Sequence, residues 1–297
     1  MYLQEIIKNI TNKLTDIQNP DYRYIPMYHK QLPSVQTLKE IVDVIKEIIF
    51  PGYFGNPMIT ENSIQYHTGV NAEKLYHLLF EQIYSALTLE TSGTNVQSLA
   101  KEKTLLFIDK LPKIKHLLST DIKAVYDNDP SAKSYGEIIF CYPTIKALLN
   151  YRTAHELFLL EIPFIPRIIT EMAHAETGID IHPGAIIGKY FSIDHGTGIV
   201  IGQTAVIGNH VCLYQGVTLG AKNFIPDETG KPIDMPRHPI LEDYVTVYSN
   251  SSILGRITIG ERTIVGGNVW LTHSVPPNSR IIQTKAAEDT FTDGLGI

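Results

Sequence analysis

Apolar residues recur every three to four positions through the first half of the chain, which is the spacing of one face of an α-helix. This spacing predicts helices over residues 38–50, 72–90, 98–118 and 143–161. A further helix is expected after Pro166 and should end near Thr177 and Gly178, because glycine is a common helix terminator. We therefore expect residues 1–177 to form an α-helical domain of antiparallel helices packed as a bundle.

After Gly178 the apolar spacing changes to six. Three in-phase series share it: Ile181, Ile187 and Ile193; Ile201, Ile207, Leu213 and Leu219; and Leu241, Val247, Ile253, Ile259, Val265 and Leu271. A six-residue repeat is typical of a parallel β-helix in which three hexapeptides complete one triangular coil of about eighteen residues. The expected fold class is α+β, with the helical domain followed by a left-handed parallel β-helix of hexapeptide repeats over 178–283. Residues 284–297 are left as a C-terminal tail.

Two irregularities interrupt the coil. In IDHGTGIVIG the step from Ile193 to Ile201 is eight residues instead of six. Its glycines allow close approach of backbone and substrate, so we expect a bulge that sets Asp194 and His195 at the edge of the solenoid. The second interruption, AKNFIPDETGKPIDMPRHPI over 221–240, is too polar and proline-rich for coils and is predicted to be an extruded loop.

Composition narrows the class of protein. The chain has 297 residues, 43% of them apolar, and a formal net charge of −6, which disfavours a basic surface for nucleic acid. Its two cysteines, Cys141 and Cys212, form no CxxC pair, which argues against a disulfide framework and fits a reducing cytoplasm. The N-terminal residues lack the apolar stretch of a signal peptide, and no window resembles a membrane span. A cytoplasmic protein without membrane contact is expected.

Polar residues at the interruptions are the candidates for chemistry. Asp180 and His195 lie fifteen residues apart, which would bring them close on successive coils of about eighteen residues. A carboxylate bound to one imidazole nitrogen leaves the other nitrogen free to accept a proton, as a general base acting on a hydroxyl requires. The alternative is that Asp180 caps a turn and His195 is a surface residue. Spacing alone leaves both open.

Arg237 and His238 end the extruded loop. An arginine offers a planar fork suited to a carboxylate or a phosphate. The alternative is a structural role in which Arg237 clamps the loop to the solenoid. His210 and His273 are interpreted as solvated turn residues, and Cys212 as a packing residue and not a nucleophile.

The motifs also carry a resemblance. GIDIHPGAIIGKYFSIDHGTGIVIG, VTLGA, RHPI and VPPNS, together with DNDPSAKSYGEIIF and YRTAH in the helical half, resemble serine O-acetyltransferase. The resemblance implies transfer of an acetyl group from acetyl-CoA to the hydroxyl of L-serine, giving O-acetyl-L-serine for cysteine biosynthesis. It implies that His195 is the general base and Asp180 its orienting partner.

The same resemblance implies the substrate contacts. Asp129, with Asp127 as a nearby alternative, and Asp194 would hold the serine ammonium, Arg237 its carboxylate, and His238 would line the pocket. Acetyl-CoA would lie along a groove whose matching positions are Ala221, Lys222, Ser249 and Gly267. The loop KNFIPDETGKPIDMP is longer than the usual glycine-rich connection, which leaves its contacts to CoA open.

A thioester needs proximity, a base and an oxyanion donor, so no metal is expected. Because neither cysteine is suitably placed as a nucleophile, we expect direct transfer through a ternary complex and no acetyl-enzyme. The family implies homotrimers with sites between subunits, and a dimer of trimers through the helical halves. Its acidic tail ending in isoleucine, matched by DGLGI, implies that Ile297 binds O-acetylserine sulfhydrylase. Feedback inhibition by L-cysteine in the serine pocket is likewise implied.

Three other interpretations compete. A hexapeptide acyltransferase for a sugar or another amino acid would share the base and CoA and differ at Asp129, Asp194 and Arg237. A zinc-dependent carbonic anhydrase on the same coil needs three imidazoles that converge on one metal between subunits. The chain offers five histidines for that purpose: His182, His195, His210, His238 and His273. A non-catalytic scaffold would leave the Asp and His interruptions unexplained.

Overall fold

The computed structural model describes residues 2–16, 18–19, 30–90, 95–223, 226–231 and 233–283. The chain divides into two compact units, Met1–Leu32 and a second unit that begins at Pro33. The first unit contains helix α1 (Tyr2–Leu14), which has no buried residue. The second unit contains the remaining described helices and the whole β-solenoid, whose core is continuous. The tail from residue 284, including Ile297, lies outside the described residues.

The helices of the second unit are α2 (Val35–Ile49), α3 (Ile64–Glu90), α4 (Val96–Ile108), α5 (Leu111–Asn128), α6 (Tyr135–Cys141), α7 (Pro143–Leu159) and α8 (Ile165–Thr177). Every range that the apolar spacing predicted as helical contains a helix, while the short helix α6 and the first eight residues of α3 were not predicted. The prediction of one helix over 98–118 was wrong, because α4 ends at Ile108 and α5 starts at Leu111. Pro112 explains the break, since proline inside a helix loses a hydrogen bond and clashes with the carbonyl four residues earlier. Gly178 ends α8 with a φ of 70°, as expected.

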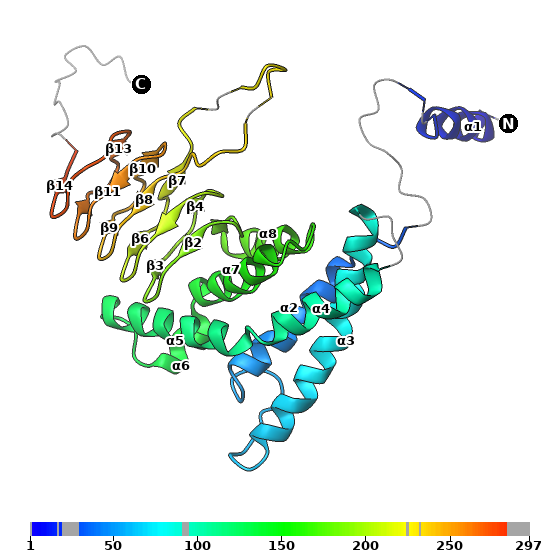
Figure 1. The fold of residues 1–297 in the computed structure, drawn as a ribbon, viewed down its shortest axis with the longest axis horizontal. Coiled ribbons are helices and arrows are strands. Elements are labelled where there is room, and N and C mark those ends of the chain that lie inside the picture. The colour runs from blue at the N-terminus through cyan, green and yellow to red at the C-terminus, as the bar shows by residue number, and fades with distance from the viewer. Residues whose placement is uncertain are drawn as a thin grey trace. The chain divides into compact units, whose positions relative to one another are not determined.

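The hexapeptide prediction is confirmed by a parallel solenoid with three sheets (Figure 1). Face 1 consists of β1 (Asp180–Ile181), β4 (Val200–Ile201), β7 (Thr218–Gly220), β10 (Ser252–Leu254) and β13 (Trp270–Leu271). Face 2 consists of β2 (Ile186–Ile187), β5 (Val206–Ile207), β8 (Ile240–Leu241) and β11 (Thr258–Ile259). Face 3 consists of β3 (Ser192–Asp194), β6 (Cys212–Tyr214), β9 (Thr246–Val247), β12 (Ile264–Val265) and β14 (Arg280–Ile281). The residues that recur every six positions point inward and are buried.

Because successive strands belong to successive faces, the turns stack into three edges. Turns from face 3 to face 1, which include residues 195–199, form the His195 edge. Turns from face 1 to face 2, which include 202–205 and the long connection 221–239, form the Arg237 edge. Turns from face 2 to face 3, which include 188–191 and 208–211, form the Tyr190 edge. The long connection leaves the solenoid between β7 and β8, as the extruded loop was predicted to do (Figure 1).

Helix α7 anchors the first coil through its YRTAH segment. Arg152 donates to the carbonyls of Ile187 and Gly188 at 3.0 and 2.8 Å and forms a buried two-point ion pair with Asp121 of α5. Tyr151 donates its hydroxyl to the carbonyl of Ala185 at 2.7 Å. These bonds satisfy backbone carbonyls at the open end of the solenoid, so the helices fix the coil that carries His195. Among the described residues, no helix has the length and apolar character needed to cross a membrane.

Candidate active site

The eight-residue step forms a bulge on the His195 edge. The amide of Gly198 donates to the carbonyl of Gly178 at 2.8 Å, and the amide of Gly216 in the next coil donates to Thr197 at 2.9 Å. Gly196 has a φ of 91°, and a Cβ there would lie 2.6 Å from Cδ1 of Ile179. Only glycine fits this backbone, so the bulge is a built feature of the coil.

Asp194 ends β3 and His195 opens the bulge, with a φ of 56°. Their side chains are 37% and 75% exposed, and Nε2 of His195 lies 3.8 Å from Oδ1 of Asp194. The structure thus sets both residues at the solenoid edge, where a substrate has access to the imidazole.

Asp129 at the end of α5 faces the same place. Its Oδ1 accepts hydrogen bonds from the amide and hydroxyl of Ser131 at 2.8 and 2.6 Å, and its Oδ2 accepts from the hydroxyl of Tyr142 at 2.7 Å. The bonds from Ser131 and Tyr142, with a smaller contribution from the charge of His195, hold the pKa of Asp129 below its usual value. An ionised Asp129 is therefore ready to accept an ammonium group. Asp127, the alternative, is paired with Lys123 at 2.9 Å on an exposed face.

A small pocket lies between Asp129 and Asp194. Its lining includes Asp129 and Tyr142 from the helical region and Asp194, Cys212 and Tyr214 from the solenoid. Asn128 donates to the hydroxyl of Ser192 at 2.9 Å, and Thr144 donates to the carbonyl of Ile193 at 3.1 Å. The end of α5 and the start of α7 are thereby fixed against β3. The structure places Asp129 and Asp194 on one pocket, with His195 next to Asp194 along the chain, and their roles stay predictions.

Sequence reasoning missed the residues that support this pocket. Ser131 could have been found, because a hydroxyl two positions after an aspartate commonly closes a turn onto its carboxylate. The contact of Tyr142 with Asp129 had no signal in the sequence, since it depends on how α6 and α7 return toward α5. Burial raises the pKa of the Cys212 thiol, which agrees with its interpretation as a packing residue.

Asp180 does not contact His195 in the described part of the single chain. It lies on face 1, where Nη1 of Arg167 is 3.8 Å from its Oδ1. Asp180 is in register with Val200, twenty residues later, because the bulge adds two residues to the eighteen assumed from the repeat. The sequence argument that paired Asp180 with His195 assumed a coil of eighteen residues, and this coil has twenty. The role of Asp180 stays a prediction.

Arg237 and His238 lie on the Arg237 edge, across face 1 from His195. The guanidinium of Arg237 donates to Oε1 of Gln203 at 2.7 Å and to Oδ1 of Asp234 at 3.2 Å. His238 is 7% exposed, and its Nδ1 accepts from the amide of Thr204 at 3.1 Å. Burial, together with the charges of Arg237 and Arg256, lowers the pKa of His238 to about 4. His238 is therefore neutral at physiological pH.

The residues expected to contact acetyl-CoA divide between the same two edges. Ser249 and Gly267 stack on the His195 edge, where the amide of Asn268 donates to the carbonyl of Ser249 at 2.9 Å. A Cβ on Gly267 would lie 3.3 Å from that carbonyl oxygen, so the edge is tightly packed there. Ala221 and Lys222 follow β7 on the Arg237 edge.

The histidines considered as zinc ligands are distributed over all three edges. His195 is on one and His210 on another, where it stacks between Tyr190 and Tyr244 at centroid distances of 4.3 and 4.7 Å. The group of potential ligand atoms found among the described residues is Glu171, His174 and Asp180. Arg167 pairs with both carboxylates of that group, so a cation already neutralises them.

A hexapeptide β-helix with a helical N-terminal region, carrying an exposed histidine beside carboxylates, defines a hexapeptide-repeat protein of the transferase type. Known proteins sharpen this assignment. The plasmid-borne serine acetyltransferase of Synechococcus elongatus is 47% identical over 275 residues, which cover 90% of this chain and 86% of that relative. The chain belongs to the serine acetyltransferase family, whose members are acyltransferases.

Solved structures of serine acetyltransferases are also similar to this chain. Entamoeba histolytica serine acetyltransferase 1 in complex with L-cysteine is 32% identical, with a TM-score of 0.72 over 95% of this chain and 100% of that one. Soybean serine acetyltransferase complexed with serine is 27% identical, with a TM-score of 0.54 over 82% of this chain and 95% of that one. A scan against models of protein families matched none of them.

Proposed function

We propose that this protein transfers the acetyl group of acetyl-CoA to the hydroxyl of L-serine, producing O-acetyl-L-serine for cysteine biosynthesis. The observation that carries the proposal is the exposed imidazole of His195 beside the carboxylates of Asp194 and Asp129. An amino acid with a free ammonium and a hydroxyl fits this set, since the carboxylates hold the ammonium while the imidazole reaches the hydroxyl. The family assignment supports the same substrate pair.

In the proposed reaction His195 accepts the proton of the serine hydroxyl as its oxygen attacks the thioester carbonyl. The new C–O bond forms, the C–S bond breaks, and the imidazolium returns its proton to the CoA thiolate. Asp180 orients the imidazole. Because Asp180 lies against Arg167 and shares no described bond with His195, this part requires the exposed His195 side chain to turn toward face 1. Both cysteines are spectators, so transfer is direct within a ternary complex.

The groups proposed to bind the substrate's carboxylate and part of the CoA lie on the Arg237 edge and not on the His195 edge. In one chain Arg237 and Lys222 are separated from His195 by face 1, so a complete site combines the His195 edge of one subunit with the Arg237 edge of the next. Such a heterologous contact closes into a ring, and three triangular prisms around a threefold axis satisfy it. Ser249 and Gly267 then line the pantetheine groove beside His195, Arg237 pairs with the serine carboxylate, and His238 supports the loop that presents Arg237.

Further partners are proposed from the same family. The trimers pair through their helical regions, L-cysteine competes in the serine pocket, and the tail ending in Ile297 binds O-acetylserine sulfhydrylase. The tail lies outside the described residues, so its part in the proposal rests on its sequence alone.

The test is acetyl-CoA consumption with L-serine, L-homoserine and a set of sugars, together with zinc analysis of the purified protein. Serine-dependent release of free thiol, in the absence of stoichiometric zinc, is expected. Preference for a sugar would assign the protein to a different hexapeptide acyltransferase. Bound zinc with carbon dioxide hydration would assign it to the carbonic anhydrases.

A further inference from the structure

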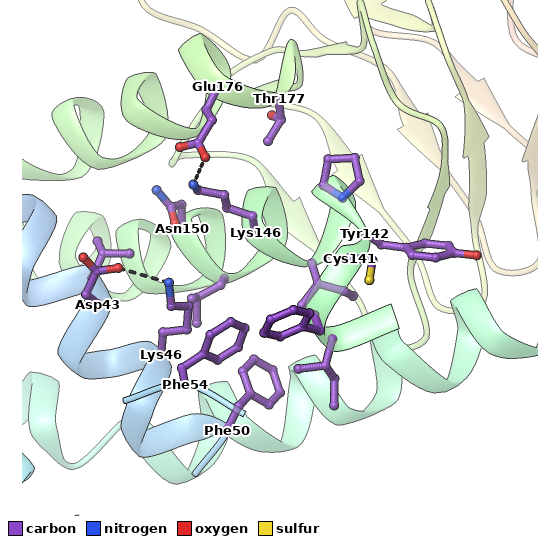
Figure 2. A pocket seen from close by; sticks show the side chains of 16 residues that line it. Asp43, Lys46, Phe50, Phe54, Cys141, Tyr142, Lys146, Asn150, Glu176 and Thr177 are labelled. Carbon is purple, nitrogen blue, oxygen red and sulfur yellow. Dashed lines mark hydrogen bonds and ion pairs between the residues drawn. The ribbon is translucent and has the colours of Figure 1, made fainter. Parts of the chain in front are cut away.

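A cavity of about 350 Å³ lies in the helical region, on the other side of Tyr142 from the small pocket of Asp129 and Asp194. It is formed by α2, by the junction of α6 and α7, and by the end of α8 (Figure 2). Its size falls in the range that holds a small metabolite. Nothing in the proposed reaction uses it.

One wall of this cavity is aromatic. Phe54 and Phe140 stack with their centroids 5.9 Å apart, and Phe50 meets Phe54 edge-on at 6.4 Å. The ammonium of Lys46 lies 4.6 Å from the centroid of Phe54. This wall offers a flat apolar surface next to a cation.

The cavity is also bordered by two ion pairs, one next to the aromatic wall and one between α7 and α8. Lys46 pairs with Asp43 at 3.1 Å, and Lys146 of α7 pairs with Glu176 of α8, as the dashed lines in Figure 2 mark. Asn150 is 2% exposed; its Nδ2 donates to the carbonyl of Ile169 at 3.0 Å, while its Oδ1 has no partner. That oxygen has almost no accessible surface, so the cavity offers its two ion pairs and its aromatic wall to a ligand and not this amide.

We propose that this cavity binds a zwitterionic amino acid with a large apolar side chain. Its ammonium is received by the carboxylate of Asp43 or Glu176, and its carboxylate by Lys46 or Lys146. Its side chain stacks on the wall of Phe54 and Phe140. Because each carboxylate is already paired with a lysine, the ammonium and carboxylate of a zwitterion bind by exchanging partners with these ion pairs, and no net charge is left unpaired. A purely apolar or purely anionic molecule cannot make this exchange.

Tyr142 links the cavity to the small pocket of Asp129 and Asp194. Tyr142 lines the cavity, and its hydroxyl donates to Asp129 at 2.7 Å. Two residues later, Thr144 donates to the carbonyl of Ile193, directly before Asp194. Occupancy of the cavity therefore biases the position of Asp129, and its expected effect is a change in the KM for serine. This effect rests on the proposed function, whereas the binding itself does not.

Binding is tested on the full chain with L-phenylalanine as the probe. Cys141 lines the cavity and is exposed, whereas Cys212 is buried, so iodoacetamide should alkylate Cys141 selectively. Saturating L-phenylalanine is expected to slow this alkylation roughly tenfold. 3-Phenylpropionate, which lacks the ammonium, and phenethylamine, which lacks the carboxylate, should each bind at least about tenfold more weakly.

A matched pair of variants checks the site. Lys146→Gln removes a cation from the cavity, and Lys74→Gln removes a similarly exposed lysine whose pair with Glu40 lies outside the cavity. Titration calorimetry should show affinity for L-phenylalanine reduced roughly tenfold in the first and unchanged in the second. Absence of protection, equal protection by all three probes, or equal loss in the two variants would overturn the proposal. Failure of serine acetylation would leave these binding results unchanged.

Discussion

Two histidines in this solenoid have nearly the same φ and differ in the surroundings of their side chains. His195 and His210 both occupy turns at positive φ, 56° and 57°. His195 stands on a bulge beside Asp194, with its ring open to solvent. His210 stands on a regular turn, stacked between Tyr190 and Tyr244, and Arg262 continues the ladder 4.7 Å above Tyr244.

The two edges also differ in how they are held. The Tyr190 edge is attached to the helices through Arg152, and the amides of Tyr190 and Phe191 donate to Thr120 and Asp121 at 3.2 Å. The His195 edge meets the helices at the floor of its pocket, while its imidazole stays exposed. One edge of the prism thus serves as an anchor, which leaves the other available to a substrate.

The largest effect on stability is expected at the anchor. Arg152→Ala leaves Asp121 buried without its partner and should lower the free energy of unfolding by about 3–5 kcal/mol. Chemical denaturation measures it. The double variant Arg152→Met, Asp121→Leu removes both charges and should recover part of the loss, and a single variant as stable as the parent would contradict the anchoring role.

The next largest effect is expected at the bulge that carries His195. Gly196→Ala puts a Cβ against Ile179 at a φ of 91° and should cost roughly 1–3 kcal/mol while displacing His195. Its matched control is Gly230→Ala, at a φ of 82° with nothing within 4 Å, which carries the backbone strain without the clash. Thermal unfolding and turnover are measured together. Equal turnover in both variants would show that the shape of the bulge is not needed.

A smaller effect is expected at Tyr142. Tyr142→Phe removes one of the bonds that keep the pKa of Asp129 low, so that pKa should rise and serine binding should weaken at a higher pH than in the parent. In the parent, the lowered pKa keeps Asp129 ionised down to acidic pH. In the variant, Asp129 becomes protonated at a higher pH, so the pH range over which serine binds well becomes narrower on its acid side. Initial rates against pH should show KM for serine raised roughly fivefold with kcat little changed. A proportional fall in kcat at constant KM would assign Tyr142 to the chemical step instead.

Features that arise from repetition could be predicted from the sequence, whereas features that arise from packing could not. The hexapeptide spacing identified the inward residues of every coil, and its single eight-residue step identified the bulge at His195. The offset of twenty between Asp180 and Val200 was not foreseen, because the extra residues of the bulge were not added to the coil length. The break at Pro112 was hidden by apolar residues that continue across it.

The hydrogen bond from Tyr142 to Asp129 is another packing contact that the sequence did not predict. The chain segment around Asp129 was recognised by its resemblance, yet the hydroxyl of Tyr142 reaches it only because a short helix and a turn bring Tyr142 back to the end of α5. The separation of Arg237 from His195 across face 1 likewise depends on which turn each residue occupies, and the spacing of motifs along the chain does not reveal that.

The most direct test compares His195→Asn with His210→Asn in the same assay. Both variants change an imidazole to an amide at nearly equal φ, and asparagine tolerates that conformation. We predict that kcat for serine-dependent CoA release falls by roughly 10²–10⁴ in the first, with unfolding unchanged, and stays within about twofold in the second. Equal losses in the two variants, or full activity without His195, would contradict the account.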